Sequence, residues 1–277
     1  MVSPRERVRR GKPVLWVDYV AYAERLLAPG GVPWTDTAAT VAWYRQAQGL
    51  IASDVIAIPL WRLIDALLVR APRLVEQMRT KQRLTHPLRA LLASEELRTS
   101  AVELVRALRS VFPGTLLAIV LPSPRTAMLL AHRASSRDSG DPETGEEEVD
   151  TAVLYLADFL RCFGEAGLDI LLLDGGEPTD AGTFEAHRPV YNVAHHYGWV
   201  VGLETGPSSP APVPNGGDFV VAHPANRDTA DLVPVRVALA SDAASEHAGF
   251  DFLHVPRDAV PENVLQSLQA IRSGAGR

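Results

Sequence analysis

The sequence has one cysteine, Cys162, among its 277 residues. A single cysteine cannot close a disulfide within the chain, and it rules out zinc sites built from several thiolates. Because its neighbours in a helical pattern are apolar, we interpret Cys162 as a small core residue. Positive charge is also scarce, since 33 acidic side chains outnumber 27 basic ones and leave a formal net charge of −6. This balance argues against a nucleic-acid-binding surface.

Long hydrophobic runs are absent as well. No run approaches the ~20 apolar residues that a membrane-spanning helix needs. The first apolar run, Val14–Val17, is too short for the hydrophobic region of a secretory signal peptide. We therefore expect a cytoplasmic protein that contacts neither membranes nor nucleic acid. Nucleotide-binding signatures are missing too, because no Gly-x-Gly-x-x-Gly follows the first apolar run and no Gly-Lys-Ser/Thr phosphate loop occurs.

The sequence does contain a repeated pattern of short apolar runs. Hydrophobic residues make up 47% of the chain, which is enough for a sizeable core. Eight such runs, bounded by turn signals, predict buried β-strands. They are Val14–Asp18, Val55–Pro59, Leu116–Leu121, Ile170–Asp174, Trp199–Glu204, Phe219–His223, Val235–Leu239 and Phe250–His254. The runs are continuous rather than alternating, which is typical of parallel strands covered on both faces.

Helical patterns lie between most of these strands. Asp36 or Thr37 can cap one helix at its start, and Ser94 precedes a first turn that holds acidic residues. The predicted helices are Thr37–Leu50, extra helical material in Trp61–Ala93, a segment from Ser94 onward, Val153–Phe163, Phe184–Tyr197 and Pro261–Ile271. His195 and His196 fall late in one of them, where imidazoles are better suited to compensating the helix dipole than to binding a metal.

This alternation predicts an α/β protein folded as a single TIM-type (β/α)8 barrel over residues 1–277. A polar, acidic stretch at about residues 132–150 predicts a loop insertion, either disordered or a lid that orders on a ligand. An open doubly wound sheet is the alternative architecture. We favour closure because eight strands fit this length and the dinucleotide fingerprint is absent.

Polar residues end most of the predicted strands, and in a barrel the active site forms at those carboxyl ends. The candidate site residues are Asp18, Tyr19, Arg125, Asp174, Glu177, Glu204, His223 and His254. Carboxylates and imidazoles can transfer protons, and a guanidinium can hold a substrate carboxylate. Each residue type also has a purely structural alternative. The carboxylates can cap turns or helices, the histidines can be hydrogen-bonded core residues, and the arginine can pair with a helix-terminal acid.

Five stretches of the chain follow one another in an order known from one enzyme superfamily. They are Arg5–Val8 with Pro13-Val14, Ile51–Ile56, Leu121–Ala127, Phe159–Asp174 and His254–Val264. In this order they resemble the uroporphyrinogen decarboxylase superfamily, which includes cobalamin-independent methionine synthases and corrinoid-linked methyltransferases. The last stretch looks like that family's closing His-Gly-x-Pro and Pro-Glu-Asn-Val segment.

The resemblance implies a barrel fold and identifies two site residues. His254 matches the family's terminal histidine, and Asp174 matches the acid that ends its fourth strand. Pro59 to Trp61 stand where the family has a second-strand aspartate, and the loop after the first strand lacks the family's arginines. The lone Cys162 cannot supply the thiolate ligands of the methyltransferase branch. The chain is therefore expected to be a divergent member.

The leading functional prediction is a lyase of the decarboxylase type that acts on a small carboxylated metabolite without a cofactor. Arg125 would hold a substrate carboxylate, Asp174 or Asp18 would position or protonate the reacting carbon, and His254 would assist. The remaining contacts to substrate would come from Tyr19, Glu177, Glu204 and His223.

Two alternatives stay open. In the first, Glu204, His223, His254 and Asp174 hold a divalent metal, and the protein is a metal-dependent lyase or a methyltransferase. In the second, the protein is a non-catalytic ligand-binding or partner subunit. A homodimer is compatible with every one of these functions.

Overall fold

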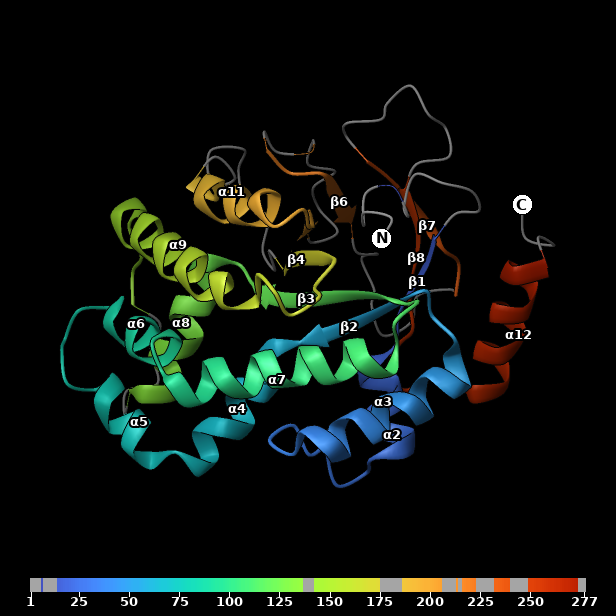
Figure 1. Cartoon of the computed structure of the whole chain (residues 1–277), viewed down its shortest axis with the longest axis horizontal. Helices are drawn as coiled ribbons and strands as arrows, with labels where there is room; N and C mark the ends of the chain where they lie inside the picture. The colour runs from blue at the N-terminus through green and yellow to red at the C-terminus, as the bar shows by residue number, and fades with distance from the viewer. Residues whose placement is uncertain are drawn as a thin grey trace.

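The computed structural model of this chain describes residues 6, 14–136, 142–174, 186–205, 213, 216–222, 232–239 and 249–273. Within them, eight strands form two sheets, with helices packed around the strands (Figure 1). One sheet holds β2 (Val55–Pro59), β3 (Leu116–Pro122), β4 (Ile170–Asp174), β5 (Val200–Thr205) and β6 (Phe219–Ala222) in that order, all parallel. The other holds β1 (Val14–Asp18), β8 (Gly249–His254) and β7 (Val235–Ala238).

The prediction of a closed (β/α)8 barrel is wrong. Such a barrel needs eight parallel strands in one continuous ladder. Here β1 and β8 are parallel, but β7 runs antiparallel to β8. The described part of the chain contains no ladder between β1 and β2 or between β6 and β7. The observed architecture is therefore a five-stranded parallel sheet beside a three-stranded mixed sheet.

Local chemistry explains the interruption between β1 and β2. The Oδ2 atom of Asp54 accepts a hydrogen bond from the Leu15 amide at 2.9 Å, and the Oγ atom of Ser53 accepts one from the Val17 amide at 3.0 Å. Side chains that precede β2 thus occupy the amide donors that a strand ladder would use. The two sheets are joined at this edge by these side-chain bonds and by one backbone bond, from the Asp54 amide to the Leu15 carbonyl at 2.9 Å, rather than by a continuous strand ladder.

The antiparallel course of β7 agrees with its side chains. Arg236 lies opposite Asp251 in the register between β7 and β8, and its Nη1 atom is 3.1 Å from the carboxylate Oδ1. Arg236 and Ala238 on one face are exposed, while Val237 on the other face is buried. A strand that buries only one face is typical of antiparallel sheets, not of the fully covered strands of a barrel.

The two sheets nevertheless share one apolar core. Alternate residues of all eight strands meet there, which identifies the inner face of each strand. The cluster comprises Trp16, Val55, Ala57, Leu116, Ala118, Ile170, Leu172, Val200, Phe219, Val221, Val237, Leu239, Phe250 and Phe252. Trp16 makes edge-to-face contacts with the rings of Phe250 and Phe252, at centroid distances of 5.6 and 5.5 Å. Gly202 leaves room for Phe219, since a Cβ at that position would lie 2.2 Å from the ring.

A second, larger core lies between the outer face of the strands and the helices. The helices are α2 (Val20–Leu27), α3 (Thr37–Ile51), α4 (Leu60–Arg70), α5 (Pro72–Met78), α6 (His86–Leu92), α7 (Glu95–Val111), α8 (Pro124–Ser135), α9 (Glu146–Leu160), the 3₁₀ helix η1 (Arg161–Phe163), α11 (Arg188–His196) and α12 (Pro261–Ser273). Figure 1 shows α7 along β3, and α9 beside α11. Among the described residues, no helix is both long and apolar enough to cross a membrane.

The individual elements agree well with the sequence. Each predicted strand lies within one residue of the observed one at either end, as far as the described residues reach. The Asp36 carboxylate accepts from the Ala39 amide, which confirms the predicted helix cap. The Ser94 hydroxyl accepts from the Leu97 amide at the start of α7, whose first turn holds Glu95 and Glu96 as expected. The predicted loop at 132–150 is shorter, because α8 continues to Ser135 and α9 begins at Glu146. Residues 137–141 lie outside the described part.

Candidate functional site

Four of the predicted site residues lie at inner-facing positions on the carboxyl ends of their strands. Asp18 follows Trp16 by two residues, Asp174 follows Leu172, and His254 follows Phe252, so each has the same orientation as an inner-core residue. Glu204 occupies the corresponding position on β5, in register with Asp174. These residues therefore form a polar layer directly above the inner core.

Asp18 and His254 are in direct contact. They face each other in the register between β1 and β8, and the Nδ1–H of the imidazole donates to Oδ2 of the carboxylate at 2.8 Å. The amide of Val255 donates to the Asp18 carbonyl at 2.9 Å, which continues the pairing one residue further. The side chains are 34% exposed for Asp18 and 15% for His254, so the pair is shielded but reachable from solvent. A carboxylate held on Nδ1 fixes the tautomer and the orientation of a histidine ring.

Asp174 and Glu204 form the polar end of the other sheet. They are partners in the register between β4 and β5, and Glu204 is 7% exposed. The Asp174 carbonyl accepts from the Ser123 amide at 2.8 Å, which ties the end of β4 to the start of α8. Carboxylate oxygens on facing positions of neighbouring strands are of the type that binds hard divalent cations.

Tyr19 lies away from this layer. It faces the outer core, is fully buried, and its hydroxyl has no hydrogen-bond partner among the described residues. Burial raises its pKa far above the usual value, and the negative charge of Asp18 adds to the effect. Tyr19 therefore belongs to the packing behind the site and does not line it.

Arg125 lies in the first turn of α8, directly after β3. Its Nε donates to the Thr144 hydroxyl at 2.6 Å and its Nη2 to the Thr144 carbonyl at 3.2 Å. The guanidinium thereby links α8 to the segment that leads into α9. A substrate carboxylate would have to replace the Thr144 oxygens to bind there.

Glu177 and His223 lie outside the described residues. Within the described ranges, no group of three or more His, Cys, Asp or Glu side chains is arranged to hold a metal ion. His195 lies in the last turn of α11, as expected, with Nε2 3.3 Å from the buried Asp218 carboxylate. Cys162 packs against the outer core, and burial raises the pKa of its thiol to about 11.

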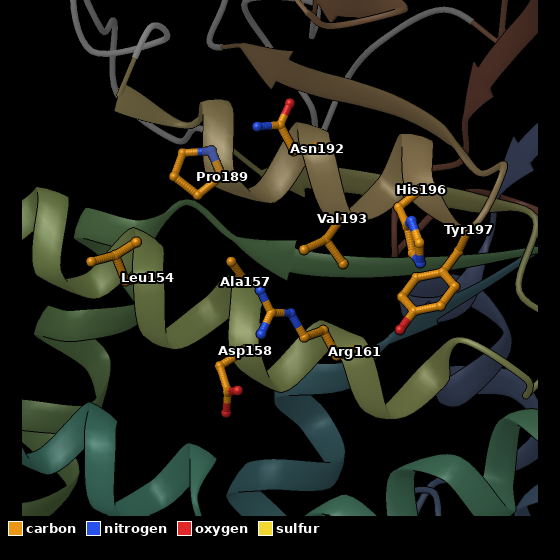
Figure 2. Close-up of a pocket in the computed structure, with 9 residues that line it drawn as sticks. All are labelled: Leu154, Ala157, Asp158, Arg161, Pro189, Asn192, Val193, His196 and Tyr197. Carbon is orange, nitrogen blue, oxygen red and sulfur yellow. The ribbon is translucent and has the colours of Figure 1, made fainter.

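The sequence interpretation missed a groove on the outer layer, between α9 and α11 (Figure 2). Its lining residues are Leu154, Ala157, Asp158, Arg161, Pro189, Asn192, Val193, His196 and Tyr197. The spacing i, i+3, i+4, i+7 in both helices was the available signal, because residues so spaced lie on one helix face. That signal shows which residues share a face but not which helix packs beside it.

A comparison of the sequence with models of known protein families found no match, and a comparison with curated protein sequences found none either.

Proposed function

We propose that this chain is an enzyme that performs acid–base chemistry on a small carboxylated molecule at the carboxyl ends of β1, β8, β4 and β5. The contact between Asp18 and His254 carries the proposal. An imidazole oriented by a carboxylate is a common general acid or base, because its reference pKa of about 6.5 allows proton transfer near neutral pH.

The reaction class we favour is that of a carbon–carbon lyase of the decarboxylase type. The bond between the substrate carbon and its carboxylate breaks, carbon dioxide leaves, and the electron pair stays on the substrate. A carbonyl or an electron-poor ring within the substrate accepts that pair. His254 then delivers a proton to the same carbon, while Asp18 stabilises the charged imidazole before transfer. The resemblance to the uroporphyrinogen decarboxylase superfamily supports this proposed chemistry, although the chain does not have the barrel of that superfamily.

Shielding of the site supports this chemistry. The polar layer lies directly on an apolar core that contains Trp16, Phe250 and Phe252. Loss of carbon dioxide moves charge from a carboxylate into the substrate, and the apolar core beneath the polar layer favours the less concentrated charge of the transition state. Arg125 remains the candidate for binding a second substrate carboxylate, in exchange for Thr144.

A metal-dependent lyase is the second candidate, and the facing positions of Asp174 and Glu204 favour it. A divalent cation held by oxygens of these carboxylates could polarise a substrate carbonyl. Mass spectrometry of the purified, chelator-treated protein, reloaded with magnesium, manganese or zinc, tests this candidate. Binding of one equivalent that is lost in Glu204→Gln would support it.

The main proposal is tested by incubating the protein with a panel of β-keto acids and of aromatic and heteroaromatic carboxylic acids. The reaction is run in deuterated water and the release of carbon dioxide is measured. We expect at least one compound to release carbon dioxide and to yield a product with deuterium at the carbon that lost it. If no compound in the panel is turned over or bound, the decarboxylase proposal fails.

A further inference from the structure

The groove between α9 and α11 has a polar end and an apolar end. Each helix precedes a strand of the parallel sheet, so their carboxyl-terminal turns lie at the same end of the groove. Arg161 follows α9 at that end, while His196 and Tyr197 lie at the end of α11. Leu154 and Pro189, from earlier turns, line the opposite end (Figure 2). The groove encloses about 670 Å³, within the range of small-molecule sites.

The charge of the polar end is positive. Asp158 is the only carboxylate among the lining residues, and Arg98 already pairs with it at 2.6 Å from outside the groove. The guanidinium of Arg161 makes neither a hydrogen bond nor an ion pair with any residue in the described part of the chain. Among the described residues, the lining therefore carries one guanidinium that no side chain pairs with directly. A guanidinium in this state favours a carboxylate or a phosphate.

Side chains of α11 add hydrogen-bonding groups to the same end. His196 offers an imidazole N–H and Tyr197 a hydroxyl, whereas the Asn192 amide, one turn earlier on α11, points away from Arg161 (Figure 2). The Tyr197 ring is held in place, because it stacks on Trp199 at 5.3 Å and meets the His196 ring edge-on at 4.8 Å. A rigid aromatic wall next to a cation is suited to a ligand with a planar body and a charged group.

The opposite end is suited to apolar groups. Ala157 and Val193 are buried at the base of the groove, and Leu154 is 59% exposed beside it. A ligand body that covers Leu154 would remove apolar surface from water. The lining side chains thus change from cationic and hydrogen-bonding at one end of the groove to apolar at the other.

We propose that this groove binds a small organic anion with an aromatic or apolar body. Its carboxylate or phosphate group lies against Arg161 and His196, and its body lies over Val193, Pro189 and Leu154. The site is separate from the Asp18–His254 site, because Leu173 and Leu203 of the intervening strands face the outer core while Asp174 and Glu204 face the inner side. The proposal does not depend on the proposed function.

Isothermal titration calorimetry with phenyl phosphate and benzoate tests it, and benzyl alcohol and inorganic phosphate serve as comparison probes. We expect one of the two organic anions to bind at least tenfold more tightly than either comparison probe. Arg161→Gln, which keeps part of the aliphatic stem but removes the charge, should weaken that binding at least tenfold. His196→Glu should abolish it by placing a carboxylate at the polar end.

Two control variants make the test specific. Arg106→Gln removes the same charge from an exposed position of α7 and should leave the affinity unchanged. His254→Gln should also leave it unchanged, because it alters the other site. The proposal is overturned if the wild-type protein binds neither organic anion, if Arg161→Gln binds as tightly as wild type, or if benzyl alcohol or inorganic phosphate binds as well as the organic anions. Melting temperatures establish that each variant is folded.

Discussion

Oδ2 of Asp18 and Nδ1 of His254 lie 2.8 Å apart, although the two residues are 236 positions apart in the sequence. The parallel register between β1 and β8 creates this contact, since it places the last residue of each strand opposite the other. Their shared orientation toward the inner face follows from strand alternation. The first and last strands in the described part of the chain thus meet and bring a carboxylate and an imidazole together at the carboxyl edge.

Replacing Asp18 by Asn tests the role of the carboxylate in this pair. The amide oxygen can still accept the hydrogen bond from Nδ1, but it cannot stabilise a positively charged imidazole. We expect kcat/KM for a substrate found in the panel to fall about 10- to 100-fold, in the range typical of general acid–base catalysis. Asp258→Asn, at an exposed position after β8, should leave kcat/KM unchanged. Equal activity of the Asp18 and Asp258 variants would contradict a role for the Asp18 charge.

Substitutions of Trp16 test the packing of the inner core. Its ring is almost completely buried, yet its indole N–H has no hydrogen-bond partner among the described residues. Trp16→Ala should lower the free energy of unfolding by about 3–5 kcal/mol. Trp16→Phe should cost much less, about 1 kcal/mol, because loss of contact area is offset by removal of an unsatisfied buried donor. Urea denaturation measures the free energy of unfolding of both variants. Equal losses in the two variants would show that the indole N–H has a hydrogen-bond partner.

A substitution of Arg109 tests the contacts that stabilise the amino-terminal side of the parallel sheet. It donates to the carbonyls of Gly167 and Thr115 at 2.8–2.9 Å and pairs with the Asp169 carboxylate, which also accepts from the Leu117 amide. Arg109→Met should lower the free energy of unfolding by about 2–4 kcal/mol, since it leaves a largely buried carboxylate without its cation. Arg106→Met, on the exposed face of the same helix, should change it by less than about 0.5 kcal/mol. A small effect at Arg109 would contradict the structural role.

His187 predicts a pH dependence of stability. Burial lowers its pKa to about 4, from a reference value of about 6.5. The folded state therefore binds a proton at His187 less readily than the unfolded state. The contribution of this residue to the free energy of unfolding is fully present above pH 6.5 and is lost as the pH falls toward 4. Between pH 7 and pH 5 the loss from this residue should be about 2 kcal/mol. His187→Phe, which keeps a ring against Tyr191, should show a correspondingly smaller loss in urea denaturation at the two pH values.

The positions of the strands could be predicted from the sequence because buried parallel strands are short apolar runs between turn residues. Whether the strands close into a barrel could not be predicted, since closure depends on which strands pair and in which direction. The run at β7 contains Arg236, and its cross-strand partner Asp251 lies in β8. Ser53 and Asp54 were equally visible in the sequence, but their bonds to β1 form only in the folded chain.

The site was predictable in part for the same reason. Strand-end positions and side-chain alternation place Asp18, Asp174, Glu204 and His254 on one side. The same alternation assigns Tyr19, one residue after Asp18, to the opposite face, where the structure has it. The bond between Arg125 and Thr144 joins segments separated by a polar stretch, and no local rule specifies such a contact.

The most direct test of the proposed chemistry is the rate of carbon dioxide release by His254→Gln on a substrate of the wild-type protein, with His132→Gln as the matched control on α8. We predict that kcat falls at least 100-fold in His254→Gln and stays at the wild-type value in His132→Gln, with both variants folded. A His254→Gln protein that releases carbon dioxide at the wild-type rate would contradict the assignment of acid–base catalysis to this pair.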